Sequence, residues 1–99
     1  MDYNGDATVV ANGTQYACQA NLRRGYETVR TPQGETLRGL GWWRGAIEVD
    51  DQAAAWAVMS ASDLRLRIGD HEGGFIATET TARGILITGN GAPPFGPQD

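Results

Sequence analysis

The sequence contains no lysine, so its positive charge comes entirely from eight arginines. Twelve acidic residues outnumber them, and the net charge at pH 7 is −4. A protein that binds nucleic acid needs a basic surface to neutralise the phosphates. The composition therefore predicts no nucleic-acid partner.

Cysteine and histidine are almost missing, with one residue of each. Cys18 has no second cysteine for a disulfide, and together with His71 it cannot complete a typical zinc site. The glycine pairs in Gly39-Leu40-Gly41 and Gly89-Asn90-Gly91 lack the strand–loop–helix context of a phosphate-binding loop. We therefore expect no metal and no cofactor.

Long hydrophobic runs are missing too. No apolar segment approaches the roughly 18 residues that cross a bilayer, and Met1-Asp2-Tyr3-Asn4 lacks the basic and apolar regions of a signal peptide. The sequence thus predicts no membrane partner and a cytoplasmic location. Its 99 residues fit one domain, which we place at 1–95, followed by a disordered tail at 96–99.

Glycine, by contrast, is abundant, with 14 residues scattered along the chain. Such a distribution favours short strands joined by tight turns. Asn12-Gly13 lies between two β-favourable runs and predicts a hairpin, because both central positions of a type I′ turn need positive φ. Alternate residues from Tyr16 to Leu22 are apolar, which predicts a half-buried strand. Cys18 lies on its apolar side and is expected to be an unreactive core residue.

The remaining pattern predicts further strands and one helix. Arg23-Arg24-Gly25 is expected to break the second strand, and Gln52 to Met59 is expected to form a helix capped by Asp50 or Asp51. Trp56 is then expected to lie on the helix face that covers the core. The predicted strands are 7–11, 14–22, 26–31, 35–49 (one bent strand or two short ones), 64–68, 75–80 and 85–88, with turns or loops at 32–34, 70–74 and 82–84.

These elements define the expected fold class. Six to seven short strands, with turns about every eight to twelve residues, predict an all-β and mainly antiparallel domain with one short helix. The pattern is typical of a small barrel or a sandwich, and it does not decide between the two.

The most unusual segment is Trp42-Trp43-Arg44. Successive side chains of a strand point to opposite faces, so one indole fills the core and the other does not. Small residues precede Trp43 on its face, which predicts that Trp43 is buried. Trp42 then shares its face with Arg44 and forms a binding surface, because Trp and Arg are favoured at interfaces. Tyr26 and Glu27 are expected to contribute to this surface from the neighbouring segment.

Glu79 is a second candidate for the site, and its role depends on which face of its strand is buried. In a regular strand it shares a face with Phe75 and Ala77. If the face of Phe75 is the interior, Glu79 is a buried or pocket-lining carboxylate that needs a partner such as Arg44. If the strand faces the other way, Glu79 is an ordinary surface charge.

Three parts of the chain resemble a known family. They are Tyr3-x-Gly5-x-Ala7-Thr8-Val9, Gly39-x-x-x-Trp43-x-Gly45 and Ile87-Thr88-Gly89-x-Gly91-x-Pro93-Pro94-Phe95. They resemble an actinobacterial domain of unknown function that occurs alone or attached to the C-terminus of flavin-dependent monooxygenases. The resemblance implies a small all-β domain and a link to flavin-dependent or secondary metabolism. It implies no mechanism, because the family has no assigned activity.

Our leading hypothesis is a non-catalytic accessory or binding module that engages a protein partner or a small apolar metabolite through the region of Trp42 and Arg44. One alternative is a small β-barrel enzyme, such as a cyclase or isomerase of a biosynthetic intermediate, with Glu27 or Glu79 as the acid or base. Another is a structural subunit of a homo-oligomer such as a homodimer. An enzyme needs a cavity of about 300 Å³ or more with convergent polar groups, whereas a module that binds a protein needs an exposed apolar patch.

Overall fold

The computed structural model describes residues 2–82 and 84–96. The disordered tail predicted at 96–99 therefore falls outside the described residues except for Gly96, as does residue 83 in the predicted turn at 82–84. Six strands and one helix lie within the described part of the chain: β1 (Asp2–Ala11), β2 (Thr14–Arg30), β3 (Thr36–Val49), α1 (Gln52–Ser60), β4 (Leu64–Ile68), β5 (His71–Thr81) and β6 (Gly84–Asn90).

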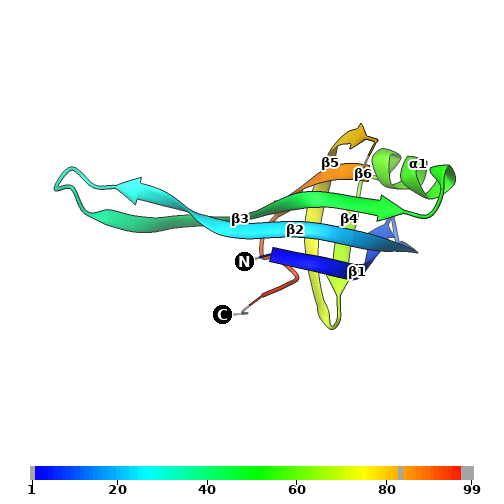
Figure 1. Ribbon diagram of the computed structural model, residues 1–99, viewed down its shortest axis with the longest axis horizontal. Helices are drawn as coiled ribbons and strands as arrows, with labels where there is room; N and C mark the ends of the chain where they lie inside the picture. The colour runs from blue at the N-terminus through cyan, green and yellow to red at the C-terminus, as the bar shows by residue number, and fades with distance from the viewer. Residues whose placement is uncertain (1, 83, 97–99) are drawn as a thin grey trace.

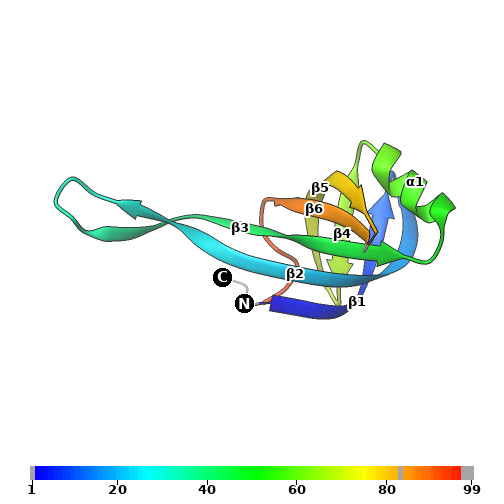
Figure 2. The same ribbon diagram turned by 45° about the horizontal axis from the view of Figure 1, so that its top comes forward.

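All six strands belong to one antiparallel sheet that closes on itself. The strand order is β1-β2-β3-β6-β5-β4, and β4 pairs with β1 to complete the ring. We call this ring the barrel; Figures 1 and 2 show it at the right of the molecule, with α1 beside it. The predicted all-β class is confirmed, and the closure decides for a barrel-like ring over a sandwich.

The second strand, β2, is much longer than the sequence suggested, whereas β3 is a single strand that nearly matches the one predicted at 35–49. Arg23 is the last residue of β2 that pairs with β1, and Arg44 is the first residue of β3 that pairs with β6. Beyond them β2 and β3 pair only with each other. This two-stranded ribbon, residues 24–43, projects from the barrel in Figure 1, and we call it the arm. It explains why the molecule measures 53 × 26 × 22 Å.

The predicted break at Arg23-Arg24-Gly25 is therefore wrong, because β2 runs through these residues to Arg30. Gly25 lies in the ladder opposite Trp42. A Cβ atom at position 25 would stand 2.7 Å from Cζ2 of Trp42. The glycine thus makes room for an indole on the neighbouring strand, rather than ending the strand.

The barrel interior is filled by apolar side chains. Trp43 is only 1% exposed, and a Cβ atom at Gly89 would overlap its indole. Its ring meets that of Phe95 edge-on, with centroids 6.4 Å apart. Phe95 belongs to the segment after β6, and its carbonyl oxygen accepts a hydrogen bond of 2.6 Å from Nη1 of Arg24. That segment therefore ties the end of the chain to the base of the arm.

The helix forms where it was predicted but presents a different face to the barrel. Oδ1 of Asp51 accepts a hydrogen bond of 2.7 Å from the backbone nitrogen of Ala54, which confirms a cap at this position. Ala54 and Val58, spaced i and i+4, are the buried residues of α1. Trp56 points away and is 74% exposed, so the prediction that it covers the core is wrong.

Two turns also test the sequence pattern. Asn12 and Gly13 have φ values of 48° and 87°, which confirms the predicted hairpin. The loop predicted at 70–74 is shorter in the structure, because β5 begins at His71, which pairs with Ile68. Gly73 belongs to β5 and is buried there, where a Cβ atom would stand 3.0 Å from Cδ of Pro94.

Candidate functional site

A groove of about 540 Å³ crosses the outer surface of the barrel at the base of the arm. We call it the outer groove. Two rows of cross-strand neighbours run through it from strand to strand. The first row is Asp2, Arg23, Arg44 and Thr88, and the second is Asn4, Asn21, Ala46 and Leu86.

The first row is charged. Arg23 and Arg44 stand directly opposite each other in the register of β2 and β3. Nε of Arg23 lies 3.6 Å from Oδ1 of Asp2, and both side chains are exposed. The guanidinium of Arg44 lies over the ring of Trp42, 4.6 Å from its centroid. No carboxylate of the described residues lies within ion-pair distance of Arg44.

The second row gives the groove an apolar floor. Ala46 and Leu86 are half-buried neighbours on β3 and β6. The side chain of Ala46 is small and leaves space between the larger side chains around it. Asn4 and Asn21 place their amide groups at the β1 side. The groove therefore combines an apolar floor with polar groups at its rim.

Trp42 and Trp43 separate as alternation requires. Trp43 is in the core, whereas Trp42 is half-buried on the outer face beside the groove. The expectation that Trp43 is the inner indole is confirmed. Trp42 packs over Gly25 and under Arg44, so its ring fixes the position of one guanidinium at the rim.

Tyr26 and Glu27 do not join Trp42. Tyr26 pairs with Gly41, on the face of the ribbon opposite to Trp42, and it is 39% exposed. Glu27 is exposed and lies at a register shift between Tyr26 and Thr28. The structure therefore separates these two predicted site residues from the pair of Trp42 and Arg44.

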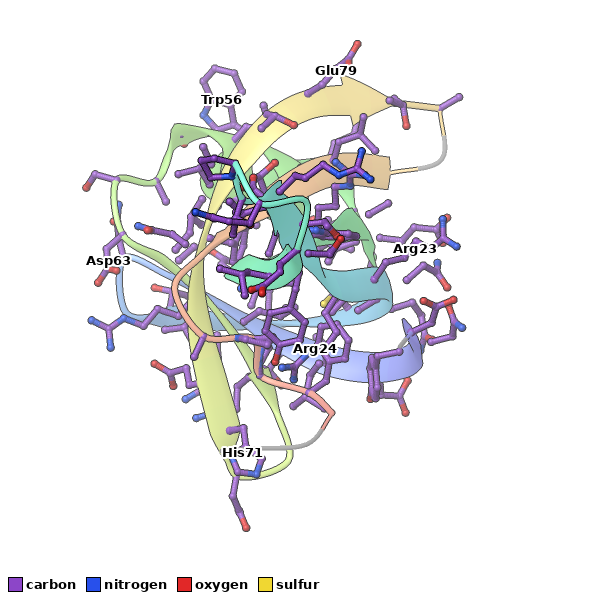
Figure 3. All side chains as sticks on the ribbon, turned by 90° about the vertical axis from the view of Figure 1, so that its left-hand side faces the viewer. Arg23, Arg24, Trp56, Asp63, His71 and Glu79 are labelled. Atoms are coloured by element: carbon purple, nitrogen blue, oxygen red, sulfur yellow. The ribbon has the colours of Figure 1, made fainter. Side chains whose placement is uncertain are left out.

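Glu79 is exposed, although the face of Phe75 is the interior. The register of β5 and β6 shifts between Ala77 and Glu79, so that Ala77 pairs with Ile87 and Glu79 pairs with Leu86. The extra residue, Thr78, turns the following side chains over. Figure 3 shows Glu79 at the outer edge of the barrel, far from His71 at its other end. Both alternatives for Glu79 assumed that Phe75, Ala77 and Glu79 lie on one face of the strand. The bulge instead moves Glu79 to the outer face.

A family model described as a domain of unknown function, DUF4873, matches residues 1–96. The chain belongs to this family. The resemblance predicted from the sequence is thereby confirmed to the extent of a small domain of unknown function. No curated protein and no solved structure matches the chain.

The DUF4873 match spans β1 to β6, so it includes every residue of the outer groove. Sequence reasoning identified Arg44 and Trp42 but missed Arg23, Asn21, Ala46 and Leu86. A usable signal for Arg23 existed, because it follows Leu22 and so points outward. The predicted break at Arg23-Arg24-Gly25 hides this signal.

Other features of this DUF4873 domain give weaker indications of a functional site than the outer groove does. The described residues contain no group of three or more His, Cys, Asp or Glu side chains that could hold a metal ion. Cys18 is buried, and burial together with the nearby Asp6 raises the pKa of its thiol to about 11. No helix within residues 2–82 and 84–96 is long and apolar enough to cross a membrane.

Proposed function

We propose that this chain is a non-catalytic binding module that holds a small, mainly apolar molecule in the outer groove. The observation that carries the proposal is the groove itself, in which an apolar floor of Ala46 and Leu86 lies beside a guanidinium fixed by Trp42. Small-molecule sites combine an apolar lining with a few placed polar groups in this way.

The packing of the barrel supports a site on the outside. All buried side chains among the described residues are apolar, and Trp43, Phe75 and Phe95 fill the interior. The alternative of an enzyme receives no comparable support. Its two acid or base candidates, Glu27 and Glu79, are both exposed, and they lie on the arm and on β5.

The test fills the groove floor without disturbing the core. Ala46→Trp places an indole in the outer groove, and Ala17→Trp places one on the outer face of β2 at a matched position away from it. We expect 2-naphthamide, a neutral apolar probe, to shift the NMR amide signals of β3 and β6 in the wild type and in Ala17→Trp. Ala46→Trp should abolish these shifts.

Two results would count against the proposal. One is the absence of shifts at millimolar probe concentration. The other is an unchanged response in Ala46→Trp, provided that its spectrum shows the barrel to be folded.

A second candidate function is contact with a protein through the arm. Tyr26, Val29 and Leu37 on the arm are 39%, 49% and 50% exposed, and both edges of the ribbon lack a neighbouring strand in the described chain. Exposed edges of this kind pair readily with another strand. The occupant that we propose is a second copy of the chain, because antiparallel pairing of one edge with itself closes a twofold dimer.

Sedimentation velocity tests this second candidate. The comparison variant replaces residues 26–41 with Asn-Gly, which leaves Gly25 and Trp42 paired beside a two-residue turn. We expect the full chain to dimerise at concentrations of a few hundred micromolar and the shortened variant to remain monomeric. A monomeric full chain would exclude the dimer.

We also propose, from the family resemblance alone, that the bound molecule belongs to flavin-dependent or secondary metabolism. The sequence motifs at both ends of the chain support this link. Binding of substrates or products of a flavin-dependent monooxygenase encoded beside this chain would test it, and failure of all of them to bind would contradict it.

A further inference from the structure

We infer that the outer groove selects a ligand with a carboxylate joined to its apolar body, and that Arg23 and Arg44 hold this carboxylate. The inference rests on the proposed function, since it names the chemical class of the molecule in the groove. Its first support is the charge of the groove and its second is the way in which Arg44 is held.

Arg23 and Arg44 are direct cross-strand neighbours on the outer face. Like charges at opposed positions destabilise a sheet. Two arginines nevertheless stand opposite each other here, in a chain that has more acidic than basic residues. An anion between the two guanidinium groups would convert this repulsion into two attractions. The pair is therefore suited to an anion at the rim of the groove.

Arg44 is positioned for such an anion before it binds. Stacking on Trp42 occupies one face of the guanidinium and leaves its N–H groups, which lie in the plane, available as donors. Trp42 is itself fixed, because it packs over Gly25. A planar fork of donors held in this way matches the two oxygens of a carboxylate.

Asp2 shows the same chemistry within the chain. Its carboxylate approaches Nε of Arg23 at 3.6 Å. Because both side chains are more than half exposed, the pair contributes little to stability, and a ligand that also contacts Arg44 would displace it. Asp2 therefore competes with the ligand carboxylate for Arg23.

The spacing of the two rows limits the ligand. Ala46 follows Arg44 by two residues on β3, so the apolar floor begins roughly 7 Å from the row of arginines. A carboxylate attached directly to an aromatic ring or an alkyl chain bridges that distance. A long polar spacer between head and body would not.

The experiment compares two probes of similar shape, one with a charged carboxylate and one with a neutral carboxamide. Isothermal titration and NMR shifts are measured with 2-naphthoate and with 2-naphthamide. We expect the acid to bind at least tenfold more tightly than the amide, since hydrogen bonds to charged groups are the stronger ones. Acetate, which lacks the apolar body, should bind much more weakly than 2-naphthoate.

Three variants test which residues bind the carboxylate of 2-naphthoate and which one competes with it. Arg44→Gln should weaken the binding of 2-naphthoate by about tenfold or more and weaken that of 2-naphthamide much less. Arg23→Gln should act in the same direction. Asp2→Asn should tighten 2-naphthoate, because it removes the competing carboxylate. All three residues are exposed, and circular dichroism checks that each variant is folded.

The outcomes separate this inference from the proposed function. Equal binding of acid and amide, or no effect of Arg44→Gln on the acid, would overturn the carboxylate selection and leave the apolar groove as a binding site. Absence of shifts in the groove with either probe would overturn both. Weaker binding of the acid to Asp2→Asn would also contradict the inference.

Discussion

The barrel and the arm are built from the same two strands, yet they are stabilised in different ways. In the barrel, β2 and β3 each have a neighbour on both sides, and their inward side chains lie in one apolar core. In the arm they have no other neighbouring strand. A two-stranded ribbon in water is marginal by itself, so the arm needs contacts of its own.

Glycines provide those contacts. Each of Gly25, Gly39 and Gly41 lies under a large side chain of the opposite strand: Trp42, Val29 and Tyr26, respectively. A Cβ atom at these glycines would approach the covering side chains to 2.7, 3.0 and 3.4 Å. The sequence pattern assigned these glycines to a break and a bend. In the structure they let one strand of a ribbon support the other.

The two neighbouring tryptophans of β3 give the sharpest comparison between buried and exposed positions. Trp43→Ala should lower the free energy of unfolding by roughly 3–5 kcal/mol, because it removes the largest side chain of the barrel core. Trp42→Ala, on the outer face, should cost about 1 kcal/mol or less and weaken ligand binding in the groove. Urea denaturation measures both, and similar losses would show that the two faces are not distinct.

Two leucines test the barrel against the arm with one chemical change. Leu66 on β4 is fully buried, whereas Leu37 on the arm is 50% exposed. We expect Leu66→Ala to cost roughly 2–5 kcal/mol and Leu37→Ala about 0.5 kcal/mol or less. Arg67→Ala, next to Leu66 on the outward side, is a control with an equally small effect. A large loss for Leu37→Ala would mean that the arm packs against something in solution.

The thiol of Cys18 gives a pH dependence that belongs to the barrel alone. Burial, followed by the charge of Asp6, raises its pKa from 9.0 to about 11. The unfolded chain loses this proton first, so the free energy of unfolding should fall as the pH rises from about 9 to about 11. The measurement is urea denaturation across this range. Cys18→Ala should remove this part of the slope, and an identical slope in the variant would contradict the assignment.

Removal of the arm should have only a small effect on the stability of the barrel. With residues 26–41 replaced by Asn-Gly, the barrel keeps its core, which lies outside the deleted segment. The free energy of unfolding should change by about 1 kcal/mol or less. In the full chain, amide hydrogen exchange should be fast in the arm and slow in the barrel. A strongly destabilised short variant would show that the arm takes part in the fold of the barrel.

Only part of the candidate site could be predicted from the sequence. Alternation in Trp42-Trp43-Arg44 was enough to place one indole inside and the other beside Arg44. Arg23 could not be assigned to the same surface, because it lies 21 residues before Arg44 and only the register of β2 and β3 makes them neighbours. The exposure of Glu79 depends in the same way on a bulge, which changes the face of a strand without a clear mark in the sequence.

Elements that depend only on nearby residues follow from the sequence alone. Asn12-Gly13 specifies a hairpin through its positive φ angles, Asp51 caps α1, and alternation from Leu64 specifies the buried side of β4. Features that depend on distant contacts do not follow from the sequence. These are the face that α1 presents to the barrel, the closure of β4 on β1, and the continuation of β2 into the arm as the partner of β3. In the arm this is because a glycine in a sequence can indicate either the end of a strand or a place where a side chain of the opposite strand packs closely. At Gly25 the ring of Trp42 packs over the glycine, and only the pairing of β2 with β3 shows this.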